Sequence, residues 1–136
     1  MRSLLIIVLL WQPAASVLAQ SLTPQPLQSP SGVFPAELAG AWGSAEQCRV
    51  LRLGEPEHPG RATYRISAEW ISQGLVHCNV SWFGAEQQGE GKRFRALAQC
   101  GEDDLRDYRL SLLLRPEGLS IRWSLDYVTP VLQRCQ

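Results

Sequence analysis

The sequence has little of the chemistry that catalytic and metal sites require. It contains two histidines, His58 and His77, no G-x-S-x-G elbow and no C-x-x-C pair. His58 lies in a proline-bracketed loop and His77 stands beside a cysteine, so neither has an evident Ser or Cys partner for catalysis. We therefore expect a protein that is not an enzyme and that has no metal site and no cofactor.

An excess of one charge and long hydrophobic runs are also missing. Thirteen Lys and Arg balance thirteen Asp and Glu, which argues against a nucleic-acid binder because such proteins normally carry a basic excess. The apolar stretch Leu4–Leu10 is far shorter than the roughly 20 residues that span a bilayer. We expect no nucleic-acid partner and no membrane span.

The first residues are typical of a secretory signal peptide. Arg2 supplies the positive charge, Leu4–Leu10 the apolar core and Ala19 the small residue before the cleavage site. The sequence therefore predicts a signal peptide over residues 1–19 and a mature chain that begins at Gln20. The expected location is periplasmic or secreted.

The mature chain opens with a polar segment that is rich in proline. Residues 20–35 (QSLTPQPLQSPSGVFP) contain four prolines, three glutamines and three serines. Such a composition buries too little apolar surface to offset the entropy of ordering the chain. It predicts a flexible N-terminal arm over residues 20–35, followed by one folded domain over residues 36–136.

Beyond the arm, apolar and polar residues alternate with the period of β-strands. The expected strands include residues 62–70, 75–83, 92–100, 108–114 and 119–125. No 12-residue window has a convincing helical stripe, although Glu102–Tyr108 is long enough for one turn. The large side chains expected to face the interior, and to fill it without a sizeable cavity, include Tyr64, Ile66, Trp70, Val80, Trp82, Phe94, Leu112, Ile121 and Trp123.

Four cysteines in a short exported chain indicate two disulfides. If the polar segment Gly84–Gly91 is a loop, folding the chain back there sets Cys78 opposite Cys100, close enough for a disulfide, and the bulky Trp82 opposite the small Ala96. The expected turn Arg115-Pro116-Glu117-Gly118 likewise sets Leu112 opposite Ile121. The remaining pair is Cys48 with Cys135, which would tie the first strand to the last. The sequence thus predicts an all-β protein, a small antiparallel up-and-down β-barrel of seven or eight strands with two disulfides.

The start of the predicted barrel carries a Gly-x-Trp motif, Gly40 and Trp42. Glycine permits a backbone entry that a side chain would hinder, and the tryptophan can plug the end of a barrel. A late arginine, Arg134 or Arg122, is placed to stack on the indole ring. An ordinary core tryptophan at the start of a strand explains the same residues equally well.

Residues 36–53 resemble two related groups of proteins. Gly40-Ala41-Trp42 with a late arginine is similar to the calycin barrels, which include lipocalins and avidins. Ala36–Trp42, Ala45–Cys48 and Val50–Leu53 together resemble the opening of the periplasmic inhibitors of bacterial serralysin-type metalloproteases. One feature departs from that family, whose usual single disulfide joins the first-strand cysteine to one not far downstream.

The resemblance implies a function as well as a fold. In that family an exported barrel sends its flexible N-terminal arm into the active-site cleft of a zinc protease, where the free terminal amine approaches the metal. Carried over to this chain, the inhibitory residues are Gln20, Ser21, Leu22, Thr23 and Pro24. The implied partner is a secreted zinc metalloprotease or another envelope protein, and we expect a monomer.

Other functions are compatible with the sequence. A calycin-like barrel can instead hold a small apolar ligand, and a structural envelope protein needs no dedicated ligand. A possible basic stripe on the outer face, for an acidic partner, consists of Arg93, Arg95, Arg109 and Arg122. The acidic segment Cys100–Asp107 is of interest for calcium, but it lacks the EF-hand spacing and is better explained as a solvated loop.

Overall fold

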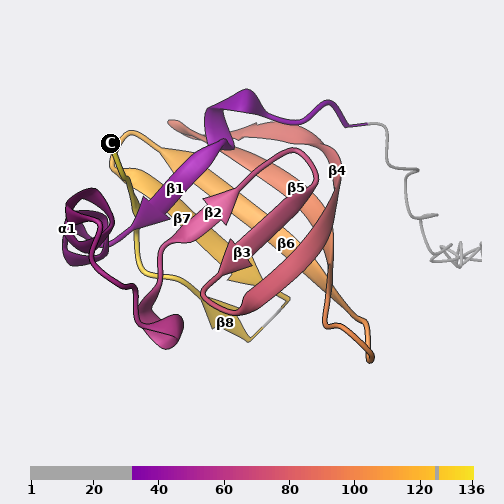
Figure 1. Ribbon diagram of the computed structural model, residues 1–136. Coiled ribbons are helices and arrows are strands. Elements are labelled where there is room, and N and C mark those ends of the chain that lie inside the picture. The colour runs from indigo at the N-terminus through magenta and orange to yellow at the C-terminus, as the bar shows by residue number, and fades with distance from the viewer. Residues whose placement is uncertain (1–31, 125) are drawn as a thin grey trace, which may run out of the picture.

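The computed structural model describes residues 32–124 and 126–136. The predicted signal peptide and most of the predicted arm, including Gln20–Pro24, lie outside these residues. The fold is mostly β, with one short α-helix and two short 3-10 helices (Figure 1). The helices are η1 (Ala36–Leu38), α1 (Ala45–Leu53) and η2 (Pro59–Arg61).

Nine strands form one antiparallel sheet that curls on itself (Figure 1). The order of neighbours is β8-β7-β6-β5-β4-β3-β2-β1-β9, so strands β1 to β8 follow each other up and down. The predicted fold class is confirmed, although the strands number nine. Their bounds are β1 (Gly40–Gly43), β2 (Tyr64–Ile66), β3 (Trp70–Gln73), β4 (Val76–Gln88), β5 (Gly91–Cys100), β6 (Arg106–Arg115), β7 (Gly118–Trp123), β8 (Tyr127–Val128) and β9 (Gln133–Arg134).

The C-terminal segment joins the two sides of the curled sheet. Strand β9 pairs with β1, with Arg134 opposite Trp42. Leu132, the residue before β9, exchanges two backbone hydrogen bonds with Leu119 of β7, at 2.9 and 2.8 Å. Gly118 lies so close to the carbonyl of Leu132 that a Cβ there would clash, and its φ of 144° is one that only glycine adopts readily. The sheet is therefore barrel-like.

The registers of the two long hairpins agree with the sequence prediction. Across β4 and β5, Cys78 lies opposite Cys100 and the bulky Trp82 opposite the small Ala96. Across β6 and β7, Leu112 lies opposite Ile121. Both predicted disulfides, Cys48–Cys135 and Cys78–Cys100, are confirmed. Two disulfides are typical of a protein that folds outside the reducing cytoplasm.

The inner face of the sheet holds one continuous core, in which β1–β3 pack across from β5–β7 (Figure 1). Most of the predicted inward side chains are buried there, and Phe94, Leu112 and Ile121 are at most 1 % exposed. Trp123 is half-buried at one end of the core. Among the described residues, no helix is long and apolar enough to cross a membrane.

The prediction of a single strand over residues 62–70 is wrong. The chain turns back after Ile66, with the Ser67 N–H donating to the carbonyl of Trp70 at 2.9 Å, and β3 starts at Trp70. This turn shifts the alternation by one position, so that Ile71 takes the inner place. Trp70 lies on the outer face, where its ring packs against His77 at 5.4 Å between centroids.

The predicted loop Gly84–Gly91 is also wrong, because most of it continues the hairpin. Strand β4 runs to Gln88 and β5 begins at Gly91, after a bulge between Trp82 and Gly84. The end of the extension is polar, with Glu86, Gln87 and Gln88, and ion pairs from Glu86 to Arg93 and Arg95 hold it together. The possible helical turn at Glu102–Tyr108 is likewise wrong, since β6 begins at Arg106.

Cys48 was expected in the first strand, but it lies in helix α1. Ser44 caps this helix in a reciprocal box, because its hydroxyl accepts from the Gln47 N–H and the Gln47 side chain accepts from the Ser44 N–H. Gly54 ends it in the left-handed conformation, with φ 68°. These caps explain why Cys48 lies in a helix rather than in the first strand.

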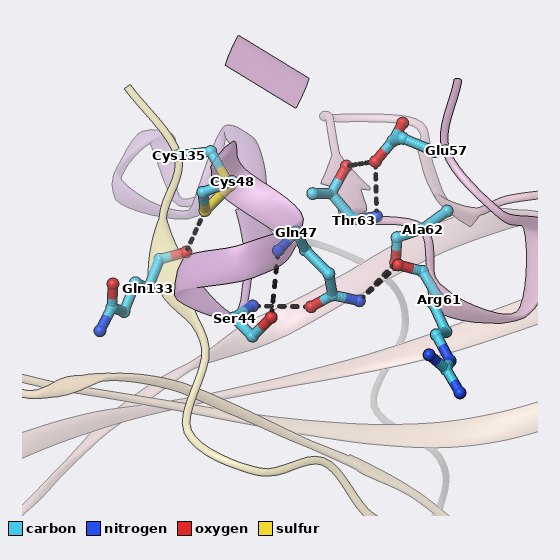
Figure 2. The surroundings of a disulfide bond; sticks show 9 residues. All are labelled: Ser44, Gln47, Cys48, Glu57, Arg61, Ala62, Thr63, Gln133 and Cys135. Atoms are coloured by element: carbon cyan, nitrogen blue, oxygen red, sulfur yellow. Dashed lines mark hydrogen bonds between the residues drawn. A yellow bond between two sulfur atoms is a disulfide. The ribbon is translucent and has the colours of Figure 1, made fainter. Parts of the chain in front are cut away.

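The Cys48–Cys135 disulfide fastens this helix to the end of the chain (Figure 2). On the other side of the helix, the Gln47 amide donates to the carbonyls of Arg61 and Ala62 at 2.7 and 3.1 Å. The helix thus bridges the C-terminal segment and the connection that leads into β2. Beside it, the Glu57 carboxylate accepts from both the backbone N–H and the hydroxyl of Thr63 at 2.8 Å.

Glu57 makes the stability of this connection depend on pH. Burial raises the pKa of Glu57, but the two bonds from Thr63 and the ion pair with Arg65 outweigh it and lower the pKa. A lowered pKa stabilises the fold above the ordinary glutamate value of about 4.3, and this stabilisation is lost as the pH falls through the folded value.

We expect Glu57→Gln to lower the free energy of unfolding at neutral pH, because the charged acceptor for Thr63 and Arg65 is lost. The loss should be only about 1 kcal/mol, since solvent reaches part of the carboxylate and screens its charge. Urea unfolding of both proteins between pH 7 and strong acid measures the difference. It should shrink towards zero as the pH drops below about 4. A difference that stays constant with pH would contradict the assigned role of the carboxylate.

Candidate functional site

The clearest candidate site is the place where the N-terminal segment joins one end of the barrel. We call the segment Gly32–Leu38 the arm root. The Gly32 N–H donates to the carbonyl of Trp82 at 3.2 Å, and the Phe34 ring packs on the Trp82 ring at 5.5 Å between centroids. A Cβ on Gly32 would lie 2.6 Å from that carbonyl oxygen, so this close approach requires glycine. The root is thus fixed to β4 before the barrel begins.

An ion pair holds the other side of the arm root. The Lys92 ammonium lies 2.6 Å from the Glu37 carboxylate and 5.2 Å from the centre of the Phe94 ring. The hydrogen bond from Lys92 lowers the pKa of Glu37. Both charges are partly exposed, so the pair contributes modestly to stability and mainly orients the root.

A hollow of about 250 Å³ lies beside the arm root. Its walls come from the root itself, from the β4 bulge and from the start of β5, including Phe34, Trp82 and Phe94. Val33 projects next to it and is 91 % exposed. An aliphatic side chain left this open, near the end of the predicted arm, is suited to contact with a partner.

Trp42 seals the barrel beneath the root. The ring is 3 % exposed and its indole N–H donates to the carbonyl of Leu38 at 2.8 Å. Arg134, rather than Arg122, stacks over the ring at 4.5 Å. The same guanidinium donates to the backbone carbonyls of Ala39, at 2.6 Å, and Glu37. Trp42 and Arg134 therefore join the root, the first strand and the last strand.

Removal of this guanidinium should loosen the root and the closure together. We expect Arg134→Ala to lower the free energy of unfolding by about 1–2 kcal/mol, because it loses one cation–π contact and two exposed hydrogen bonds. Arg122→Ala, at an outward position on β7, is the matched control and should change it by less than about 0.5 kcal/mol. Equal losses in urea unfolding would contradict a special role for Arg134.

The remaining candidate residues do not come together as a reactive centre. The His58 ring accepts a hydrogen bond from the Gly60 N–H, and His77 stacks beside Trp70. Within residues 32–124 and 126–136, no three His, Cys, Asp or Glu side chains gather in a way that could hold a metal ion. The acidic loop before β6 is solvated, and Asp104 pairs with Arg106.

Sequence reasoning missed the residues that hold the arm root. It placed Val33–Pro35 in the flexible arm, whereas Phe34 packs against the core. The available signal was the apolar pair Val33-Phe34 at the end of an otherwise polar segment. The partner Trp82 was expected only as a core residue.

The fold and the site together define a disulfide-bonded, barrel-like antiparallel β protein with an anchored N-terminal segment. Comparisons with protein-family models, curated proteins and solved structures find no match to this chain.

Proposed function

We propose that this protein is an exported binding protein of the protease-inhibitor type, located in the periplasm or secreted. Its N-terminal residues, beginning with Gln20–Pro24, would enter the active-site cleft of a secreted zinc metalloprotease. The barrel would act as the platform from which they extend. No chemistry by the inhibitor itself is required, because occupation of the cleft excludes substrate.

The anchored root is the observation that carries this proposal. A peptide that occupies a cleft loses conformational entropy on binding, and less is lost when its base is already fixed. Gly32, Phe34 and Glu37 fix that base by a hydrogen bond, an aromatic contact and an ion pair. The resemblance of residues 36–53 to the serralysin inhibitors supports the same reading.

The filled interior argues against the alternative of a small apolar ligand held inside the barrel. Buried side chains from both walls meet there, and Phe94, Leu112 and Ile121 are almost completely shielded from solvent. Lipocalin-type binding needs an empty interior of several hundred Å³. The described hollows instead lie at the ends of the sheet.

Titration of a serralysin-type protease with the mature protein tests the proposal. Residual activity should fall in proportion to added protein until a one-to-one ratio is reached. A trypsin-like serine protease should keep its activity, because it offers no zinc to the terminal amine. If the zinc protease stays fully active with the protein in molar excess, the proposed function is wrong.

A further inference from the structure

A second hollow lies at the end of the sheet opposite the arm root. On β4 the hollow is lined by Val76, at the start of the strand, whereas the arm root contacts Trp82. On β5 it is lined by Cys100, the last residue of the strand, whereas the arm root contacts Lys92 near the start. Its volume is about 240 Å³. We call it the tyrosine hollow, because all three tyrosines of the chain line it: Tyr64, Tyr108 and Tyr127, together with Trp123.

The aromatic rings of the tyrosine hollow stand as walls rather than as one flat stack. The Tyr108 and Trp123 rings are 6.0 Å apart and meet at 80°. Tyr64 is 5 % exposed and lies deep, whereas Tyr127 is 52 % exposed and lies at the mouth. Four aromatic side chains thus surround one small space, and the negative π-charge of exposed ring faces attracts an organic cation.

The charges around the tyrosine hollow favour the same kind of ligand. No residue that lines it is charged. Of the short connections at this end, the β5–β6 loop carries Glu102, Asp103 and Asp104, and the β7–β8 connection carries Asp126. Arg106, at the start of β6, neutralises one of these. Burial raises the pKa of Tyr64 to about 12, with the Tyr127 hydroxyl adding to the shift, so the deep phenol stays protonated and neutral.

Backbone strain is concentrated beside the same hollow. Ser124 has φ 53°, and it is the one residue other than glycine with positive φ in the described part of the chain. Its N–H donates to the carbonyl of Arg109 at 2.7 Å, directly after Trp123. Trp123 is paired with Tyr127 across β7 and β8. A residue with unfavourable φ next to a ring of a pocket is the kind of outlier that accompanies binding sites.

We propose that the tyrosine hollow binds a small quaternary ammonium cation, with choline as the example to be tested. The methylated nitrogen would sit among the four rings, and the acidic loops would raise the local concentration of cations. The volume suits a compact head group and is below that of pockets for drug-sized ligands. This site is separate from the arm root and does not depend on the proposed protease inhibition.

The test compares choline with its neutral carbon isostere, 3,3-dimethylbutan-1-ol, in calorimetric and NMR titrations of the mature protein. We expect choline to bind at least about tenfold more tightly, because only the cation gains from the ring faces. The indole N–H resonance of Trp123 should shift with choline. No binding of choline, equal binding of the isostere, or shifts confined to other parts of the molecule would each overturn the proposal.

Variants at the mouth locate the effect. Tyr127→Leu keeps an apolar side chain but removes one ring face, and should weaken choline binding about fivefold. Tyr127→Phe keeps the ring and should bind choline like the unaltered protein. Trp70→Leu removes an aromatic ring on the outer face, away from the tyrosine hollow, and is the matched control. If Tyr127→Leu remains folded and binds choline with unchanged affinity, the assignment of the site is wrong.

Phosphatidylcholine vesicles distinguish the two natural sources of this head group. Sedimentation of the protein with vesicles, reversed by free choline, would support the tyrosine hollow as a site for the lipid head group. Binding of free choline without vesicle sedimentation would support the tyrosine hollow as a site for the free cation. Vesicle sedimentation that choline does not reverse, in a protein that fails to bind free choline, would overturn the proposal.

Discussion

Replacement of both Cys48 and Cys135 by serine is expected to lower the free energy of unfolding by about 4–5 kcal/mol. The disulfide closes a loop between residues that are 87 positions apart, and chain-entropy estimates for loops of this length reach that value. A domain of this size has a total stability of about 5–15 kcal/mol. The double serine variant should therefore be marginally folded. Urea unfolding of this variant and of the unaltered protein, under non-reducing conditions, measures the loss.

The Cys78–Cys100 pair provides the internal comparison. Its residues are 22 positions apart within one hairpin, so replacement of both by alanine should cost about 3 kcal/mol. The order of the two losses follows from loop length alone. If the hairpin disulfide proves the more important, local packing around the fully buried Cys78 dominates and the loop argument is incorrect.

The hairpins could be predicted from the sequence because several local signals agree there. Alternation sets which side chains face inward, and one correct pairing then fixes all the others along both strands. Cys78 opposite Cys100 and Trp82 opposite Ala96 satisfy disulfide geometry and volume in the same register. In the next hairpin, the turn that contains Pro116 and Gly118 fixes the register that sets Leu112 opposite Ile121.

The segments that sequence reasoning misassigned are those where two local signals conflict. Cys48 was expected in the first strand because of the closure of the sheet, but Ser44, Gln47 and Gly54 supply both helix caps, and the local capping signals prevail. Between Ile66 and Trp70 the sequence keeps a period of two although the chain reverses direction there. The hydrogen bond from the Ser67 N–H to the Trp70 carbonyl closes this turn. A large aromatic residue was therefore assigned to the wrong face.

The candidate site could be predicted only in part, for a different reason. The stacking of Arg134 on Trp42 could be predicted, because the Gly-x-Trp motif marks the tryptophan and a cation–π contact requires only an arginine nearby. The contact between Phe34 and Trp82 depends instead on the β4 bulge, which places a carbonyl within reach of Gly32. The four rings of the tyrosine hollow come from four different strands, and no spacing in the sequence connects Tyr64 with Tyr127.

Deletion of Gln20–Ser31 is expected to abolish inhibition of a serralysin-type protease while the fold remains intact. These twelve residues, if extended, reach at most about 40 Å beyond Gly32, enough to enter a cleft. Thermal stability should change by less than about 0.5 kcal/mol, because the deletion leaves every contact of the arm root in place. Residual protease activity with each protein in molar excess measures the effect.

A longer deletion separates the arm from its anchor. Removal of Gln20–Phe34 also removes the Phe34 contact with Trp82, so we expect a further loss of about 1–2 kcal/mol in the free energy of unfolding. The predicted flexible arm over residues 20–35 is thus corrected at its end, because the Phe34 ring packs against the core. The comparison shows where the functional arm ends and the folded domain begins.

Two controls make the truncation decisive. A chain in which residues 20–31 are replaced by Gly and Ser at equal length keeps the reach but removes the side chains, and should not inhibit. The intact protein is assayed with Gln20 free and with Gln20 cyclised, since cyclisation removes the amine that would approach the zinc. Inhibition by the free form alone would support direct access to the metal. Equal inhibition by the intact and the truncated proteins would place the inhibitory surface on the barrel, where the outward Arg95, Arg109 and Arg122 would be the next residues to replace.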